Sequence, residues 1–208
     1  MKVLLINGSP RAKGCTYTAL CEVAKELEKE NIETEIFHIG SKPIRGCTAC
    51  GGCYSKSPGR CVFDDDPVNI ALEKAEQADG FVFGAPVHYA AASGGMTAFL
   101  DRLFYAGDCF KYKPGAAVVS CRRAGSTAAL DQLNKYFTIS CMPVVSSQYW
   151  NMVHGNTPEE VMQDTEGMQT MRQLGRNMAW LLKCIKAGKA AGVKEPEEEP
   201  RVWTNFIR

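Results

Sequence analysis

Short apolar segments alternate with stretches of helical periodicity along most of the sequence, and this alternation limits the possible folds more than any other feature. Strands are expected at residues 2–6, 33–39, 80–85, 115–121 and 142–146. The segments between them are long enough for the crossover connections that parallel strands require. The sequence therefore predicts an α/β fold, a five-stranded parallel sheet with helices on both faces.

Helical periodicity fills most of the connections. The first helix is expected to run to about residue 29, capped by Thr16 or Thr18. A long final helix is predicted over residues 158–186, where Met and Leu recur at three- and four-residue steps and would pack in the core or against a second subunit. Three further helices are expected at residues 67–77, 94–105 and 128–137.

The length of 208 residues suffices for one well-buried domain, which we expect over residues 1–187. A Gly- and Cys-rich loop at 40–66 is inserted after the second strand, and loops of this length usually carry function. Residues 188–208 are expected to form a solvated linker rich in Lys, Glu and Pro, and then a tail at 202–206 that docks back on the domain.

The charge balance gives no reason to expect nucleic acid or an anionic membrane as partner, because the sequence has 24 Lys and Arg residues and 23 Asp and Glu residues. No apolar run reaches the roughly 20 residues needed to cross a bilayer, and the N-terminus lacks an export signal. We therefore expect a cytoplasmic protein with a small-molecule partner. Its ten cysteines are then expected to be reduced, which favours metal, cluster or redox use over disulfides.

The loop between the first strand and the first helix has the composition of an anion site. Backbone N–H groups and the helix dipole favour a phosphate at such a position. Hydroxyls of Ser9, Thr16 and Thr18 can donate to phosphate oxygens, and Arg11 can add a charge-assisted bond. Neither the dinucleotide pattern G-x-G-x-x-G nor a Walker A loop is present, so a monophosphate is favoured.

Three segments resemble the NADPH-dependent FMN reductase branch of the flavodoxin-like superfamily. The first loop reads Gly8-Ser9-Pro10-Arg11. The segment after the third strand reads Gly84-Ala85-Pro86-Val87-His88-Tyr89 and is followed by Phe99-Leu100-Asp101-Arg102. The segment after the fourth strand reads Ser120-Cys121-Arg122-Arg123-Ala124-Gly125-Ser126. The resemblance covers about residues 1–150. It implies a flavodoxin-like three-layer sandwich of strand order 2-1-3-4-5, with FMN bound at the carboxyl ends of the strands.

The same resemblance implies which residues contact FMN. Arg122 and Arg123 are also candidates for the phosphates of NAD(P)H, the implied co-substrate. His88 is a candidate acid or base, although the flavin carries the chemistry and hydride transfer needs no side-chain nucleophile. The cofactor-binding residues expected from the three loops are Ser9, Arg11, Gly14, Cys15, Thr16, Tyr17, Thr18, Pro86, Val87, His88, Tyr89, Cys121, Arg122, Arg123 and Gly125.

Four cysteines in the inserted loop have the spacing of a metal or cluster site. Cys47, Cys50, Cys53 and Cys61 follow the pattern Cys-x2-Cys-x2-Cys-x7-Cys, which can surround one [4Fe–4S] cluster. The motif and its position are similar to the compact cysteine motif of the iron–sulfur flavoproteins. Zinc is an alternative, although its ligand pairs are usually separated by longer gaps, and reduced thiols without a metal are another.

Two functions follow from these features. One is an NAD(P)H-dependent FMN reductase that passes electrons to a small acceptor such as a quinone, an azo compound or a flavin. The other is an electron carrier in which FMN and a cluster exchange electrons with a ferredoxin-type partner. A homodimer or homotetramer is expected, because related proteins cover the exposed flavin with a neighbouring subunit. The candidate contact surfaces are the loop at 149–154 and the Met-rich final helix.

Overall fold

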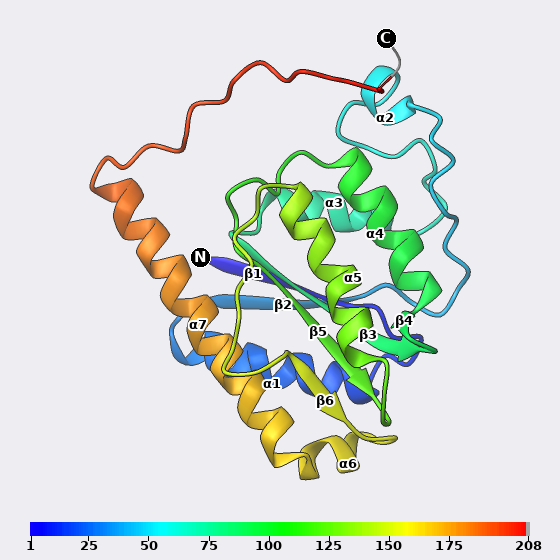
Figure 1. Ribbon diagram of the computed structural model, residues 1–208, viewed down its shortest axis with the longest axis vertical. Coiled ribbons are helices and arrows are strands. Elements are labelled where there is room, and N and C mark those ends of the chain that lie inside the picture. The colour runs from blue at the N-terminus through cyan, green and yellow to red at the C-terminus, as the bar shows by residue number, and fades with distance from the viewer. Residues whose placement is uncertain (207–208) are drawn as a thin grey trace.

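Five parallel strands form the centre of the computed structural model, which describes residues 1–206 (Figure 1). In spatial order the strands are β2 (Glu33–His38), β1 (Lys2–Asn7), β3 (Gly80–His88), β5 (Gly115–Cys121) and β6 (Met152–His154). The two-residue strand β4 (Ala91–Ala92) pairs antiparallel with the end of β3 and stands outside this order. The five parallel strands therefore follow the expected order 2-1-3-4-5, and the predicted fold class is confirmed.

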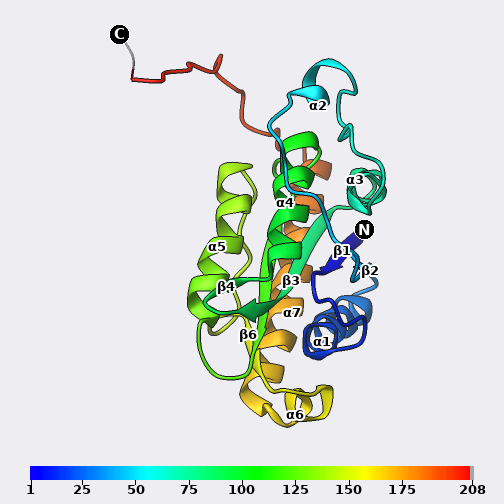
Figure 2. The same cartoon turned by 90° about the vertical axis from the view of Figure 1, so that its right-hand side faces the viewer.

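Helices cover both faces of the sheet (Figures 1 and 2). One face carries α1 (Cys15–Lys29) and α7 (Thr165–Ala190). The other carries α3 (Val68–Glu76), α4 (Gly94–Ala106) and α5 (Ser126–Ile139). Two short helices, α2 (Gly52–Ser55) and α6 (Pro158–Gln163), lie in connections.

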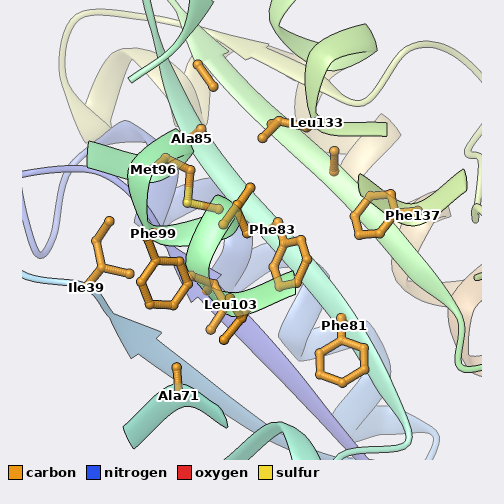
Figure 3. Close-up of a cluster of buried hydrophobic side chains, with 14 of the residues drawn as sticks. Ile39, Ala71, Phe81, Phe83, Ala85, Met96, Phe99, Leu103, Leu133 and Phe137 are labelled. Atoms are coloured by element: carbon orange, nitrogen blue, oxygen red, sulfur yellow. The ribbon is translucent and has the colours of Figure 1, made fainter. Parts of the chain in front are cut away.

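Alternate side chains of each strand enter opposite cores, as the period of two in a strand requires. On β1, Val3 and Leu5 join the core beneath α1 and α7. Leu4 joins the other core, which contains Phe83 and Phe137 with ring centroids 5.3 Å apart (Figure 3). Because both faces of β1, β3 and β5 are buried, these strands are mostly apolar rather than alternating, and that is why they are recognisable in the sequence.

The prediction of a fifth strand at 142–146 is wrong. Only an isolated bridge joins Val144 to Gly115, and the fifth strand of the sheet is β6, which begins six residues after the end of the predicted segment. Pro143 cannot donate a ladder hydrogen bond, and the Val144 side chain is exposed rather than buried. The apolar run at 142–146 therefore lies beside the start of β5 without pairing along it.

Two expectations about the helices are also corrected. The N-cap of α1 is Gly14, not Thr16 or Thr18. The predicted helix over 158–186 is two helices, since Asp164 accepts a hydrogen bond from the Gly167 N–H and begins α7. The Met-rich face is not available to a second subunit, because its residues are buried within the chain against α1 and the sheet: Met168, Met171, Leu174 and Met178.

The C-terminal tail extends away from α7 (Figure 1). Glu198 forms an ion pair with Lys111 of the domain, but the apolar side chains expected to dock, Val202, Trp203 and Phe206, are exposed to 85%, 79% and 96%. The docking expected for this tail is therefore not seen on the same chain, and residues 207 and 208 lie outside the described residues. None of the helices within residues 1–206 combines the length and the apolar character that crossing a bilayer requires.

Candidate functional site

The first loop, at the carboxyl end of β1, is folded by the buried side chain of Asn7. Its Nδ2 donates to the Ala12 carbonyl at 3.0 Å, and its Oδ1 accepts from the Ser9 N–H at 3.1 Å. The Ser9 hydroxyl accepts from the Arg11 N–H, which leaves the hydroxyl proton to donate elsewhere. Sequence reasoning missed Asn7, although an Asn directly before a Gly-Ser-Pro turn is a signal of such a loop.

No side chain caps the N-terminus of α1 at Gly14. The first N–H groups of a helix lack intrahelical partners, and together with the helix dipole they favour an anion. The hydroxyls of Thr16 and Thr18 are both engaged within the chain: Thr16 with Ser120 at 2.8 Å, and Thr18 as a donor to the Gly14 carbonyl at 3.3 Å. The backbone of this turn and the Ser9 hydroxyl are therefore free to donate to a phosphate, and Thr16 is free to do so where Ser120 is the donor in their bond.

Glycines bring the backbone of this edge close together. Gly8 donates its N–H to the Gly84 carbonyl at 2.8 Å, and its own carbonyl accepts from the Ser93 hydroxyl at 3.0 Å. A Cβ on Gly84 would lie 2.8 Å from Thr16 and 2.9 Å from Leu20, so only glycine allows α1 to pack this closely on β3. Hydrogen bonds to the main chain of Gly8 thus join the first loop to β3 and to the start of α4.

The second loop is the hairpin between β3 and β4, and the third follows β5. Pro86 and Val87 are half-buried, whereas His88 and Tyr89 are exposed, Tyr89 with a φ of 58°. Gly125 in the third loop has a φ of +85°, and a Cβ there would lie 2.6 Å from the Tyr89 carbonyl. The two loops therefore touch, and together with the first they frame one surface at the carboxyl edge.

The remaining predicted residues lie on the same edge. Burial raises the pKa of the Cys121 thiol and of the Cys15 thiol, so both are apolar lining rather than reactive groups. Arg122 and Arg123 are exposed. His38 Nε2 forms a hydrogen bond with the Ser9 carbonyl at 2.7 Å. All fifteen expected FMN contacts are therefore in the three loops or the first turn of α1, a surface whose backbone donors and close-packed glycines fit FMN.

The four cysteines of the inserted loop line one hollow at the far end of α4. Cys47 and Cys50 are exposed, while Cys53 and Cys61 are half-buried. Within residues 1–206, no three Cys, His, Asp or Glu side chains converge closely enough to hold a single metal ion. In a [4Fe–4S] cluster each thiolate binds a different iron, so the sulfur atoms stand further apart than around one zinc ion. Four thiols around one hollow are a donor set that such a cluster would accept.

The backbone of this loop is tightly turned. Gly51 has a φ of +67°, and a Cβ on Gly52 would lie 2.3 Å from the Val62 side chain. A hydrogen bond from the Gly52 N–H is the main cause that lowers the pKa of the Cys50 thiol. Burial, followed by the charges of the other three cysteines, raises the pKa of the Cys53 thiol. The thiols are thus close enough to influence one another.

Two buried polar side chains that sequence reasoning missed hold Cys61. Asn69 on α3 accepts from the Cys61 N–H at 2.9 Å and donates to its carbonyl at 2.9 Å. Arg102 on α4 donates from Nε to the Cys61 Sγ at 3.2 Å. The signal for Arg102 was a charge three residues after Phe99 on an otherwise apolar helix face.

Comparison with known proteins agrees with this description. The chain matches the NADPH-dependent FMN reductase family over residues 1–157. An iron–sulfur flavoprotein of Methanocaldococcus jannaschii is 32% identical over 195 residues, which cover 89% of this chain and 100% of that protein. An FMN-dependent NADPH-azoreductase of Staphylococcus saprophyticus is 31% identical over 115 residues, which cover 55% of this chain and 57% of that protein.

Solved structures agree on the fold. RosB with a bound flavin-phosphate intermediate has a TM-score of 0.70 at 16% identity, covering 100% of this chain and 93% of RosB. A flavodoxin from the domain Archaea has a TM-score of 0.58 at 16% identity, covering 88% of this chain and 99% of the flavodoxin. The family match covers well over half of the sequence, and the full-length relative exceeds 30% identity. The chain therefore belongs to the NADPH-dependent FMN reductase family, as an FMN-dependent oxidoreductase of flavodoxin-like fold.

Proposed function

We propose that this protein is an iron–sulfur flavoprotein, which moves electrons between FMN at the carboxyl edge of the sheet and a [4Fe–4S] cluster in the inserted loop. The observation that carries the proposal is the single hollow lined by Cys47, Cys50, Cys53 and Cys61. Cysteine thiolates are the usual ligands of such clusters. The full-length relative from Methanocaldococcus jannaschii is itself named an iron–sulfur flavoprotein, which supports the assignment.

The chain's part at the flavin is to bind and orient. Bound FMN would supply the redox chemistry at its isoalloxazine ring. The turn at Gly14 and the Ser9 hydroxyl would hold the phosphate, and the stiff segment from Pro86 to Tyr89 would lie along the ring. Buried Cys121 and half-buried Cys15 line that edge. The positive end of α1 favours the negative charge of the phosphate.

The two sites lie at opposite ends of α4. The start of α4 is beside the first loop, where Ser93 bonds Gly8, and its end is beside the cysteines, where Cys53 Sγ contacts the Tyr105 carbonyl. The 13 residues of α4 span roughly 20 Å at 1.5 Å per residue. We therefore also propose a homodimer or homotetramer, in which one subunit brings its cysteine loop to the flavin edge of another.

The test is a composition measurement on protein expressed and purified without oxygen. We expect one FMN per chain, with about four iron and four acid-labile sulfide atoms. Cys61→Ser should lose most of the iron and keep FMN, whereas Cys184→Ser, at an exposed thiol outside the loop, should keep both. Iron near zero in the unsubstituted protein, with FMN fully bound, would sink the proposal.

A second candidate function, an NAD(P)H-dependent reductase that acts on a small acceptor such as a quinone, an azo compound or a flavin, is favoured by one observation. Arg122 and Arg123 are exposed next to the flavin surface, where guanidinium groups suit nicotinamide cofactor phosphates. The azoreductase relative supports this function. His88, exposed on the same edge, is its candidate acid or base.

Rapid mixing separates the two functions. Fast bleaching of the bound flavin by NADPH or NADH favours the reductase, whereas slow bleaching with fast reduction by reduced ferredoxin favours the electron carrier. Replacing both Arg122 and Arg123 by Gln should raise the KM for the nicotinamide by a larger factor than the Kd for FMN. Arg201→Gln, in the exposed tail, is the control.

A further inference from the structure

Arg102 is the largest fully buried side chain among the described residues, at 1% exposed. A buried guanidinium is stable only where its charge and its N–H groups find partners. An Arg side chain stays protonated in proteins, and the Asp66 side chain, itself buried, forms an ion pair with it. The guanidinium is therefore charged, and the acceptors of its N–H groups show which part of the chain it holds in place.

Every partner of Arg102 lies in the inserted loop. Its Nε donates to the Cys61 Sγ at 3.2 Å, and Nη2 donates to the Phe63 carbonyl at 2.9 Å. Nη1 donates to the Arg45 carbonyl at 3.2 Å and to the Asp66 carboxylate. Arg45 precedes the first cysteine of the motif, whereas the other partners include and follow the last. One side chain thus joins the two arms of the loop that carries all four thiols.

We infer that Arg102 is a positioning residue for the cysteine site: it fixes Cys61 as the fourth ligand, and its N–H bond to that sulfur raises the reduction potential of the cluster. The inference rests on the proposed function, because it concerns the cluster assigned to these cysteines. Asp66 has the opposite effect, since its carboxylate offsets the guanidinium charge from the far side.

The direction of the expected change in reduction potential follows from the charge of the two side chains. Reduction adds one negative charge to a cluster, and a cationic N–H donor on a ligand sulfur stabilises the more negative state. Removing the donor should shift the midpoint potential down. Removing the compensating carboxylate should shift it up. A residue with a merely structural role would not give opposite shifts for the two substitutions.

The experiment uses full-length protein purified without oxygen, with FMN, iron and sulfide counted and the cluster titrated to its midpoint. The variants are Arg102→Lys, Arg102→Gln and Asp66→Asn, and Asn keeps the Oδ1 that accepts from the Val68 N–H. The control is Arg60→Gln, next to Cys61 in sequence but paired at the surface with Asp64. We expect a lower midpoint or lost iron in both Arg102 variants with FMN retained, a higher midpoint in Asp66→Asn, and no change in Arg60→Gln.

Unchanged iron and midpoint in the Arg102 and Asp66 variants would overturn the inference alone. Loss of FMN and of the native circular dichroism spectrum would show that both Arg102 variants fail to fold. In that case Asp66→Asn decides, because a higher midpoint potential of its cluster supports the inference and an unchanged midpoint potential refutes it. No iron in the unsubstituted protein would overturn the proposed cluster, and with it the inference.

Discussion

The hydroxyls of Thr16 and Ser120, 104 residues apart in sequence, meet at 2.8 Å beneath the carboxyl edge of the sheet. Thr16 lies in the first turn of α1 and Ser120 near the end of β5, and both are buried. This bond therefore fixes the turn at Gly14, the proposed phosphate site, relative to the third loop, which lies on the other side of β3.

Thr16→Val keeps the shape of the side chain and leaves the Ser120 hydroxyl buried without its partner. We expect a loss of about 1–3 kcal/mol in the free energy of unfolding, with weaker FMN binding. Adding Ser120→Ala removes the unsatisfied group, so the double variant should lose less than the two single variants summed. Urea unfolding measures the cycle, and Thr138→Val, at an exposed hydroxyl, is the control. Simple additivity would contradict the assignment.

Gly84→Ala should disturb the packing of α1 on β3, because the added Cβ would meet Thr16 and Leu20. Overpacking of this kind costs about 1–3 kcal/mol. Gly95→Ala is the matched control, since no atom lies within 4 Å of its added Cβ and Ala is favoured over Gly in a helix by roughly 0.5–1 kcal/mol. Urea unfolding should give opposite signs for the two variants; equal effects would show that the approach at Gly84 is not tight.

Gly125→Ala should weaken FMN binding, because its Cβ would press on the Tyr89 carbonyl and separate the second loop from the third. Gly192→Ala provides a control with nearly the same backbone, a φ of +84° against +85°, but with open space around the added Cβ. Both variants carry the same backbone strain, so only the contact differs. Fluorescence titration of the apoprotein with FMN compares them, and equal affinities would exclude a role for this contact.

Glu26 should make stability depend on pH. The hydrogen bond from Lys29 and then the bond from Arg176 hold the pKa of this carboxyl below its ordinary 4.5, although burial opposes them. A pKa lowered by folding gives stability that is present above the unfolded value and is lost as the pH falls through the folded one. Below about pH 4.5, Glu26→Gln should lose stability less steeply than the unsubstituted protein. Glu199→Gln, in the tail, should follow the unsubstituted protein.

The sheet could be predicted from the sequence because its inner strands β1, β3 and β5 are buried on both faces and appear as apolar runs. The segment at 142–146 resembled such a run, but it makes a single bridge, and the true strand β6 has only three residues. The break between α6 and α7 was visible in retrospect, since Thr157 and Asp164 are both N-cap residues. Helical periodicity alone does not reveal an N-cap residue that lies inside a continuous apolar pattern.

The candidate sites could be placed to the level of loops but not of hydrogen bonds. The four cysteines and the first loop were evident from spacing and composition. Asn69 and Arg102 were not, because each acts through a contact with the backbone or sulfur of the inserted loop. Long-range contacts of this kind depend on the completed packing, which no local pattern encodes.

The inserted loop is held by α3 and α4, through Asn69, Tyr105 and Arg102, and its four thiols lie at the end of α4 away from the flavin surface. The three loops at the carboxyl edge are instead joined to one another through Gly8, Thr16 and Gly125. A lineage could therefore discard the cysteines while its flavin pocket stayed under unchanged selection. The loop is in this sense an accessory to the flavin surface, and its loss would require one further change, the replacement of buried Arg102, whose hydrogen-bond partners lie in the loop.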